Sequence, residues 1–216
     1  NAKSPRDFFK ERRGQTVSYG TCEVSIPRNH ETGDLETPFM LRKHFEMPEK
    51  HIVLMRIDLR KQSEFMDDLR LAVVAGKTNE ALIFVHGFNN TFEDAARRTA
   101  QIAHDIQFSG VPMFYSWPSE GKLSEDAYIR DGNDATQAIS YLKLFLKDIV
   151  ENAKFSSVTL LAHSMGNHTL TQAFMALKSE IGAAKLRVFK EIILAAPDID
   201  ADTFRNQIAP ALITSK

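Results

Sequence analysis

The feature that most constrains the fold of this chain is a repeated alternation between short apolar runs and amphipathic helical segments. Runs such as Ala81–Val85 and Glu191–Ala196 are too short to cross a membrane, but they have the length of strands buried on both faces of a parallel sheet. The stretch Asp134–Ala153 instead has apolar residues three and four positions apart, which form one wide stripe on a helix. This alternation is typical of α/β folds, in which helices cover a mostly parallel sheet.

The remaining elements continue the same alternation along nearly the whole chain. Further strands are expected at Thr16–Ile26, His51–Leu59, Val111–Tyr115 and Ser157–Ala162. Further helices are expected at Ser63–Ala75, Thr91–Ile106, Gly166–Lys178 and Thr203–Leu212. The polar segments Pro27–Lys50 and Trp117–Asn133 are expected to be loops. The predicted order is therefore β-β-α-β-α-β-α-β-α-β-α.

Length and composition limit the functions that such a chain can have. Its 216 residues are expected to form a flexible tail over residues 1–15, beginning with the cloning remnant Asn1-Ala2, and one domain over residues 16–216. Lys and Arg number 27 and Asp and Glu 28, and the resulting net charge of −1 argues against nucleic-acid binding. Cys22 is the single cysteine, which excludes an internal disulfide and leaves the cellular compartment open. Phosphate-loop, dinucleotide and metal-ligand motifs are absent from the sequence, so neither a cofactor nor a metal is expected.

Ser164 stands between a predicted buried strand and a predicted helix, within the sequence Ala162-His163-Ser164-Met165-Gly166. A nucleophile elbow places its serine at such a sharp turn, and the residues two positions before and after it must be small. Ala162 and Gly166 meet this requirement. The N-terminus of the following helix would also stabilise an anionic tetrahedral intermediate. Ser164 is therefore the predicted nucleophile, with His163 and Gly166 as supporting residues.

His86-Gly87-Phe88 follows an earlier buried strand and supplies a second part of an acyl-transfer site. In such sites one oxyanion donor is the N–H of the residue after the serine, here Met165, and the other comes from the turn after an earlier strand. Phe88 fits that second role, and Gly87 lets the backbone approach the substrate closely. His86 is expected to brace the turn. The alternative interpretation is a polar turn followed by a helix cap.

Five motifs spread along the chain resemble the α/β-hydrolase superfamily and, within it, a bacterial branch of unknown function. They are Ser18–Pro27 (SYGTCEVSIP), Phe84–Asn90 (FVHGFNN), Phe114–Ser119 (FYSWPS), Leu161–Gly166 (LAHSMG) and Ala196–Asp200 (APDID). The resemblance implies an α/β-hydrolase fold, Ser164 as nucleophile, and the amides of Phe88 and Met165 as the oxyanion hole. It implies no particular substrate.

The other two members of a serine-hydrolase triad are harder to place. In α/β hydrolases the acid and the histidine follow the serine along the chain, but no histidine follows His168, which lies just after Ser164. We therefore expect a chain that is truncated before its last two strands, with the catalytic histidine beyond residue 216. Asp198 and Asp200 are candidate acids, and the alternative is that both cap the helix Thr203–Leu212.

The sequence also predicts an exposed sheet edge, a substrate pocket and an activity. Truncation would leave Glu191–Ala196 as an exposed sheet edge, which predicts self-association or further material packed there. Trp117 would line an acyl pocket under a lid, unless Trp117–Asn133 is an ordinary surface loop with one packed tryptophan. The predicted activity is hydrolysis of a small-molecule acyl ester. A thioesterase or acyltransferase would use the same residues, and the alternative from another class is a non-catalytic binding module.

Overall fold

The computed structural model describes residues 14–36, 46–75, 78–119 and 121–213. Its strands are β1 (Tyr19–Ser25), β2 (Val53–Arg60), β3 (Glu80–Val85), β4 (Val111–Tyr115), β5 (Ser157–His163) and β6 (Phe189–Ala195). Its α-helices are α1 (Gln62–Val74), α2 (Phe92–Asp105), α3 (Glu125–Asp148), α4 (Gly166–Ile181), α5 (Ala201–Thr203) and α6 (Ala209–Leu212). The order of strands and helices agrees with the prediction from the sequence.

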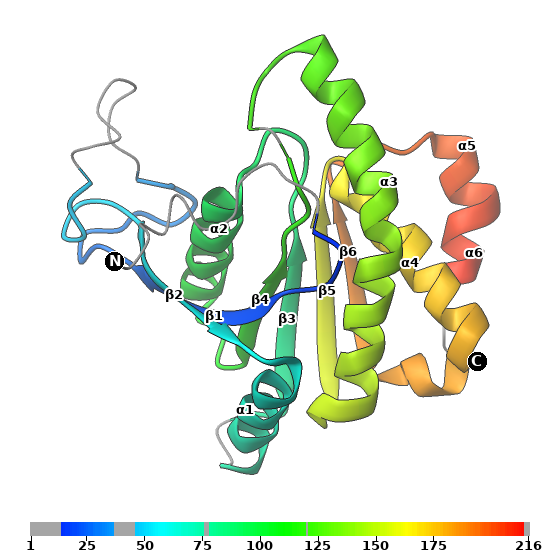
Figure 1. Ribbon diagram of the computed structural model, residues 1–216, viewed down its shortest axis with the longest axis horizontal. Helices are drawn as coiled ribbons and strands as arrows, with labels where there is room; N and C mark the ends of the chain where they lie inside the picture. The colour runs from blue at the N-terminus through cyan, green and yellow to red at the C-terminus, as the bar shows by residue number, and fades with distance from the viewer. Residues whose placement is uncertain (1–13, 37–45, 76–77, 120, 214–216) are drawn as a thin grey trace.

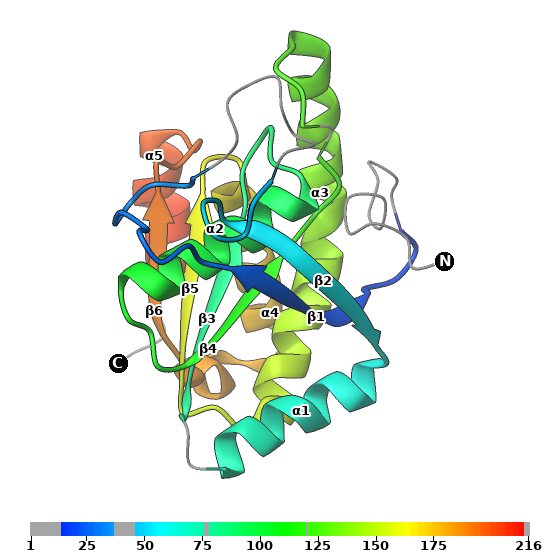
Figure 2. The same ribbon diagram turned by 90° about the vertical axis from the view of Figure 1, so that its left-hand side faces the viewer.

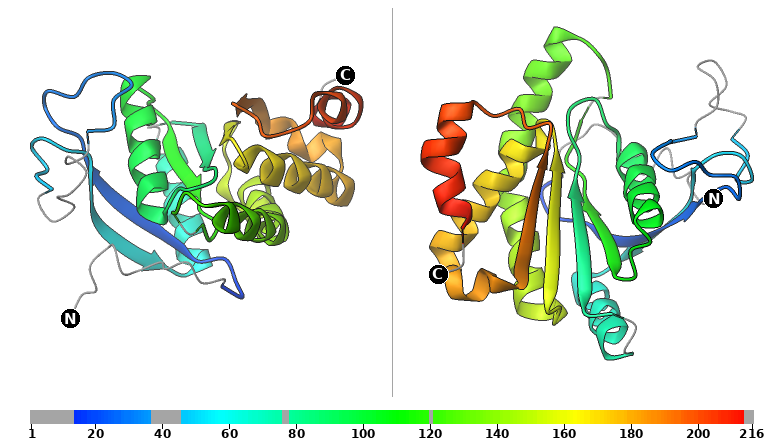
Figure 3. Two further views of the ribbon diagram at one scale, coloured as in Figure 1. Left: turned by 90° about the horizontal axis from the view of Figure 1, so that it is seen from above. Right: turned by 180° about the vertical axis from the view of Figure 1, so that it is seen from behind.

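Four strands form a parallel sheet in the order β4-β3-β5-β6. The chain moves from β3 to β4 on one side, and then reverses direction to form β5 and β6 on the other. Because crossovers between parallel strands are right-handed, this reversal places α2 on one face of the sheet and α3 and α4 on the opposite face (Figures 1 and 3). The predicted α/β architecture, with helices flanking a parallel sheet, is confirmed.

The first two predicted strands lie outside this parallel sheet. β1 and β2 form an antiparallel pair of their own, with a register from Tyr19 opposite Arg60 to Ser25 opposite Val53. The pair crosses beside α2 and β4 (Figure 2). The alternating burial of β1 is typical of an antiparallel strand with one solvated face, whereas β3 is buried along nearly its whole length. The expectation of a mostly parallel sheet therefore holds for the last four strands only.

The core holds the strands of the parallel sheet rigidly side by side. Ala81–Val85 is buried at every position, as its continuous apolar sequence predicts. α3 and α4 contribute Leu142, Phe145, Leu170 and Phe174 to the same cluster of buried side chains. Each such side chain contributes roughly 1.5–3 kcal/mol when it is fully buried. The carboxyl ends of β3, β5 and β6, where the predicted site residues lie, are thus fixed relative to one another.

Helix α3 begins at Glu125, whereas its apolar stripe predicts a start at Asp134. Ser124 caps it by accepting a 3.1 Å hydrogen bond from the N–H of Ala127. The helix is further tied to the preceding loop by the buried Asp131, whose carboxylate accepts a 2.6 Å bond from Ser119. Much of the predicted loop Trp117–Asn133 is therefore helical. The sequence pattern missed these turns because their buried side is formed by the small Ala127 and the charged Asp131, whereas the larger Tyr128 and Ile129 are exposed.

Strand β6 forms one edge of the four-stranded sheet in the part of the chain that the structure describes. The helical segment that follows it, from α5 through a π-helical turn (Phe204–Ile208) to α6, is tied to α4 by a 2.6 Å bond from Lys178 Nζ to the carbonyl of Ala211. Self-association through β6 stays a prediction. The predicted tail lies almost wholly outside the described residues. Within those residues, no helix is long and apolar enough to cross a membrane.

A buried histidine ties the segment after β1 to the end of α2. His30 Nδ1 lies 2.8 Å from Glu36 Oε1, and its Nε2 lies 2.6 Å from Asp105 Oδ1. Burial disfavours the charged ring, but the hydrogen bonds to Asp105 and Glu36 outweigh this and raise the pKa of His30. His104 is the other titratable side chain at this cluster, with its ring 5.3 Å from that of His30. The imidazolium thus bridges two carboxylates.

We expect His30→Gln to lower the Tm by about 3–6 °C near pH 6, and by less as the pH rises. A raised pKa in the folded state means that the stabilisation by His30 is fully present below its unfolded pKa of about 6.5, and is lost as the pH rises through the folded value. Thermal unfolding of wild type and variant from pH 5.5 to 9 measures this. His104→Gln, at an exposed neighbouring position, should change the Tm little at any pH. A Tm difference between wild type and His30→Gln that grows with pH would contradict the bridge.

Candidate active site

Ser164 occupies a strained turn between β5 and α4, at the carboxyl edge of the sheet. Its φ is +50°, in the left-handed region that costs a non-glycine residue of order 1–3 kcal/mol. β5 ends at His163 and α4 begins at Gly166, so the whole reversal from strand to helix takes place around this one serine. This is the geometry that a nucleophile elbow requires, and it presents the hydroxyl above the end of the strand.

Close packing around Gly166 holds the strained turn in place. A Cβ atom at this position would lie 2.4 Å from the carbonyl oxygen of His86 and 2.8 Å from that of Val85. The start of α4 therefore packs directly on the backbone at the end of β3. Ala162, the small residue on the other side of the elbow, is fully buried. Gly166 is thus required by contact with the neighbouring backbone, and Ala162 by its complete burial.

Asn167 ties the elbow to the end of β6, a role that the sequence analysis did not assign. Its side chain is fully buried, and Nδ2 donates to the carbonyl of Ser164 at 2.7 Å and to that of Ala195 at 3.0 Å. The N–H of Ser164 donates to the same Ala195 oxygen at 3.0 Å. The available signal was a polar asparagine three residues after the predicted nucleophile, at the start of a helix expected to pack on the sheet. These bonds fix the serine relative to the strand that leads to Asp198.

The turn after β3 packs so closely on Ser164 that Gly87 has no room for a side chain. A Cβ atom on Gly87 would sit 2.8 Å from the Cβ of Ser164, and 3.2 Å from Nδ1 of His163. Asn90 Nδ2 donates to the carbonyl of Phe88 at 2.7 Å, which fixes the orientation of the following peptide. Among the described residues, no acceptor takes a hydrogen bond from the N–H of Phe88 or of Met165. The role of both amides as oxyanion donors stays a prediction.

His86 and Trp117 brace this turn from the interior. His86 is fully buried, its Nδ1 lies 2.9 Å from the carbonyl of Gly87, and its Nε2 accepts from the N–H of Trp117 at 3.2 Å. Burial lowers the pKa of His86, so the ring is neutral. The indole of Trp117 stacks on His86 and donates from Nε1 to its carbonyl at 2.9 Å. Trp117 is only 2% exposed, so it supports the turn instead of lining an open acyl pocket.

The two candidate acids lie in different surroundings on the loop after β6. Asp200 caps α5 by accepting a 2.8 Å bond from the N–H of Thr203, and that bond lowers its pKa. This matches the helix-capping alternative. Asp198 instead accepts a 2.7 Å bond from the hydroxyl of Tyr128, and this bond raises the pKa of the tyrosine. No described histidine is hydrogen-bonded to either carboxylate, so a triad role for Asp198 or Asp200 stays a prediction.

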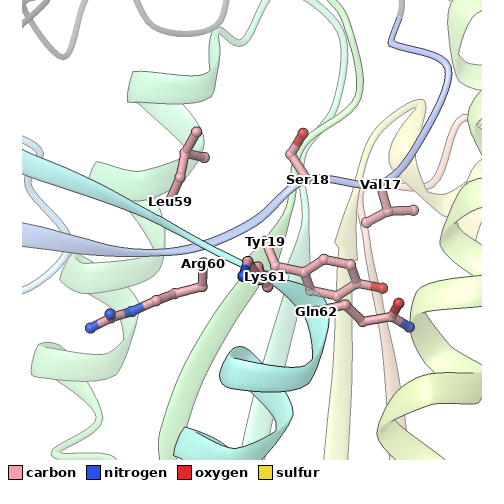
Figure 4. Close-up of a pocket in the computed structure, with 7 residues that line it drawn as sticks. All are labelled: Val17, Ser18, Tyr19, Leu59, Arg60, Lys61 and Gln62. Carbon is pink, nitrogen blue, oxygen red and sulfur yellow. The ribbon is translucent and has the colours of Figure 1, made fainter.

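The described histidines do not supply a base in contact with Ser164. His163 and His168 are both exposed, and the Ser164 hydroxyl forms no hydrogen bond with any histidine in the described ranges. A groove of about 370 Å³ does exist, lined by Tyr19, Arg60, Gln62 and their neighbours (Figure 4). Tyr19 donates to Asp148, the last residue of α3. Tyr128, which is bonded to Asp198 at the carboxyl edge of the sheet, lies near the other end of this helix. The groove is therefore remote from Ser164. No group of metal-binding side chains occurs among the residues that the structure describes.

A strained serine between a parallel strand and a helix, on a sheet of this order, places the chain in the α/β-hydrolase class. Residues 61–216 match the model of a family described as alpha/beta hydrolase of unknown function (DUF900), and the chain belongs to this family. The resemblance seen in the sequence is thereby confirmed. Neither the curated proteins nor the solved structures gave a match.

Proposed function

We propose that the protein is a serine hydrolase that cleaves carboxylic esters, with Ser164 as its nucleophile. The observation that carries the proposal is the left-handed backbone of Ser164 at the strand-to-helix turn, packed against Gly87. Proteins retain a strained residue of this kind where the surrounding structure holds it in place, and such residues cluster at active sites.

The chemistry follows from the groups around Ser164. Its Oγ bonds to the ester carbonyl carbon and gives up its proton, and the negative charge that develops on the carbonyl oxygen is bound by the N–H groups of Phe88 and Met165. The N-terminus of α4 adds a favourable partial charge. The bond to the alcohol then breaks, the alcohol leaves with a proton, and water releases the acid from the acyl-enzyme. The proton acceptor is the part of this machinery that the described histidines do not provide.

Covalent labelling with a fluorophosphonate tests the proposal, because such probes phosphonylate activated serines. We expect intact-protein mass spectrometry to detect one adduct on the wild-type protein at its full natural length, which carries the predicted catalytic histidine, and none on Ser164→Ala. Ser179→Ala, an exposed serine on α4, is the matched control and should label like the wild type. The absence of any adduct on the wild type would refute the proposal and favour the non-catalytic binding module.

Labelling of Ser164 does not distinguish an ester hydrolase from a thioesterase or an acyltransferase. The three reactions share the acyl-enzyme and differ in the group released or in the acceptor. Release of acid from an oxygen ester into water supports the ester hydrolase. Faster turnover of the matched thioester, or transfer to an added alcohol in preference to water, would favour one of the other two activities.

A further inference from the structure

Apolar side chains gather in solvent at the beginning of α3, where nothing in the fold requires them. Leu123 is 82% exposed, Ile129 63% and Tyr128 45%. Farther along the same helix, Ala138 and Leu142 are buried in the core as expected for an amphipathic helix. Exposed apolar patches of this kind mark binding sites more often than isolated surface residues do.

Tyr128 connects this apolar segment to the loops on both sides of Ser164. Its ring meets that of Phe88 edge-on, with centroids 5.3 Å apart, and its hydroxyl is bonded to Asp198. Phe88 follows β3 and Asp198 follows β6, and these strands flank β5, which ends at Ser164. A side chain that contacts both loops must therefore lie across the carboxyl end of β5. The ribbon agrees, because the first turns of α3 project beyond the ends of the strands (Figure 1).

We propose that the first turns of α3, with Tyr128 at their centre, bind the hydrocarbon chain of the substrate. This inference rests on the proposed function and deepens it, because it assigns the substrate class as esters that carry an aliphatic chain of several carbons. The chemistry of the segment supports that occupant, since the hydroxyl of Tyr128 is already paired with Asp198, and the exposed Leu123 and Ile129 of the same segment are aliphatic. Each methylene buried there strengthens binding roughly fourfold.

Two fluorophosphonates that differ only in a methyl or an octyl chain test this assignment. With two or more methylenes buried, we expect the octyl probe to modify wild-type Ser164 at least tenfold faster than the methyl probe, as measured by mass spectrometry against time. Tyr128→Ala should lower this ratio about tenfold through slower reaction of the octyl probe. Tyr128→Phe, which keeps the ring and loses the bond to Asp198, should keep the ratio within twofold.

The control variant is Leu144→Ser, which removes an exposed apolar side chain from the distant half of the same helix. It should react like the wild type with both probes. The assignment is overturned if Tyr128→Ala keeps the wild-type ratio, if Tyr128→Phe falls to the alanine value, or if Leu144→Ser lowers the ratio equally. Labelling of the wild type by both probes at equal rates rejects the hydrocarbon site and leaves the serine hydrolase standing. No labelling by either probe rejects both proposals.

Discussion

Replacement of Gly166 by alanine is expected to destabilise the protein by about 2–4 kcal/mol, at the upper end of the range for overpacking. The added Cβ would lie 2.4 Å from the carbonyl oxygen of His86 and 2.8 Å from that of Val85. Both neighbours are backbone atoms of the central strand and the turn after it, so neither can rotate away as a side chain could. The start of α4 would have to move off β3. Urea unfolding followed by circular dichroism measures the change.

Gly132→Ala provides the matched control for this prediction. Gly132 lies within α3, and no atom outside its chain neighbours and the nearby backbone of the helix lies within 4 Å of the Cβ that alanine would add. The change should therefore stabilise the protein by roughly 0.5–1 kcal/mol, because alanine is the better helix former. If Gly166→Ala unfolded at the same urea concentration as Gly132→Ala, the close packing of the elbow on β3 would be wrong.

Replacement of Gly87 by alanine is expected to slow the reaction of Ser164 with a fluorophosphonate by about 10²–10³-fold, the usual effect of removing an oxyanion donor. The new Cβ would lie 2.8 Å from the Cβ of Ser164 and 2.8 Å from the carbonyl oxygen of His163. The turn must shift away from the serine, and the N–H of Phe88 moves with it. The second-order rate constant of labelling measures the loss.

The matched control for Gly87→Ala is Ser179→Ala, which should react at the wild-type rate. Circular dichroism at the assay temperature shows whether the glycine variant is folded, so that slower labelling can be assigned to the site. A folded Gly87→Ala protein that reacts as fast as the wild type would show that the turn after β3 is not part of the oxyanion hole.

Local patterns predicted the central strands and the position of Ser164 well. The apolar run Ala81–Val85 and the small residues around Ser164 are local signals with a direct physical cause, which is burial on both faces in one case and crowding at a tight turn in the other. The start of α3 was predicted wrongly, because the buried side of its first turns consists of the small Ala127 and the charged Asp131, which continue the helical period without a large apolar side chain. The capping residue Ser124 is the local sequence signal for this helix start.

The position of Trp117 could not be read from the sequence for a different reason. The sequence allowed Trp117 either to line an acyl pocket or to pack in the interior. Its contact with His86, which lies more than thirty residues earlier in the chain, decides between the two. Only the pairing of β3 with β4 brings the two rings together. The contact between Tyr128 and the loops after β3 and β6 was hidden in the same way.

By itself, the sequence determined the α/β class, the buried strands and the strained serine, because each depends on the burial or backbone freedom of neighbouring residues. Only the tertiary structure decided that β1 and β2 pair apart from the parallel sheet, that Asn167 locks the elbow to β6, and that Tyr128 lies across the end of β5. These contacts join residues from separate strands and helices. Their geometry is set by strand order and right-handed crossovers, which no local pattern encodes.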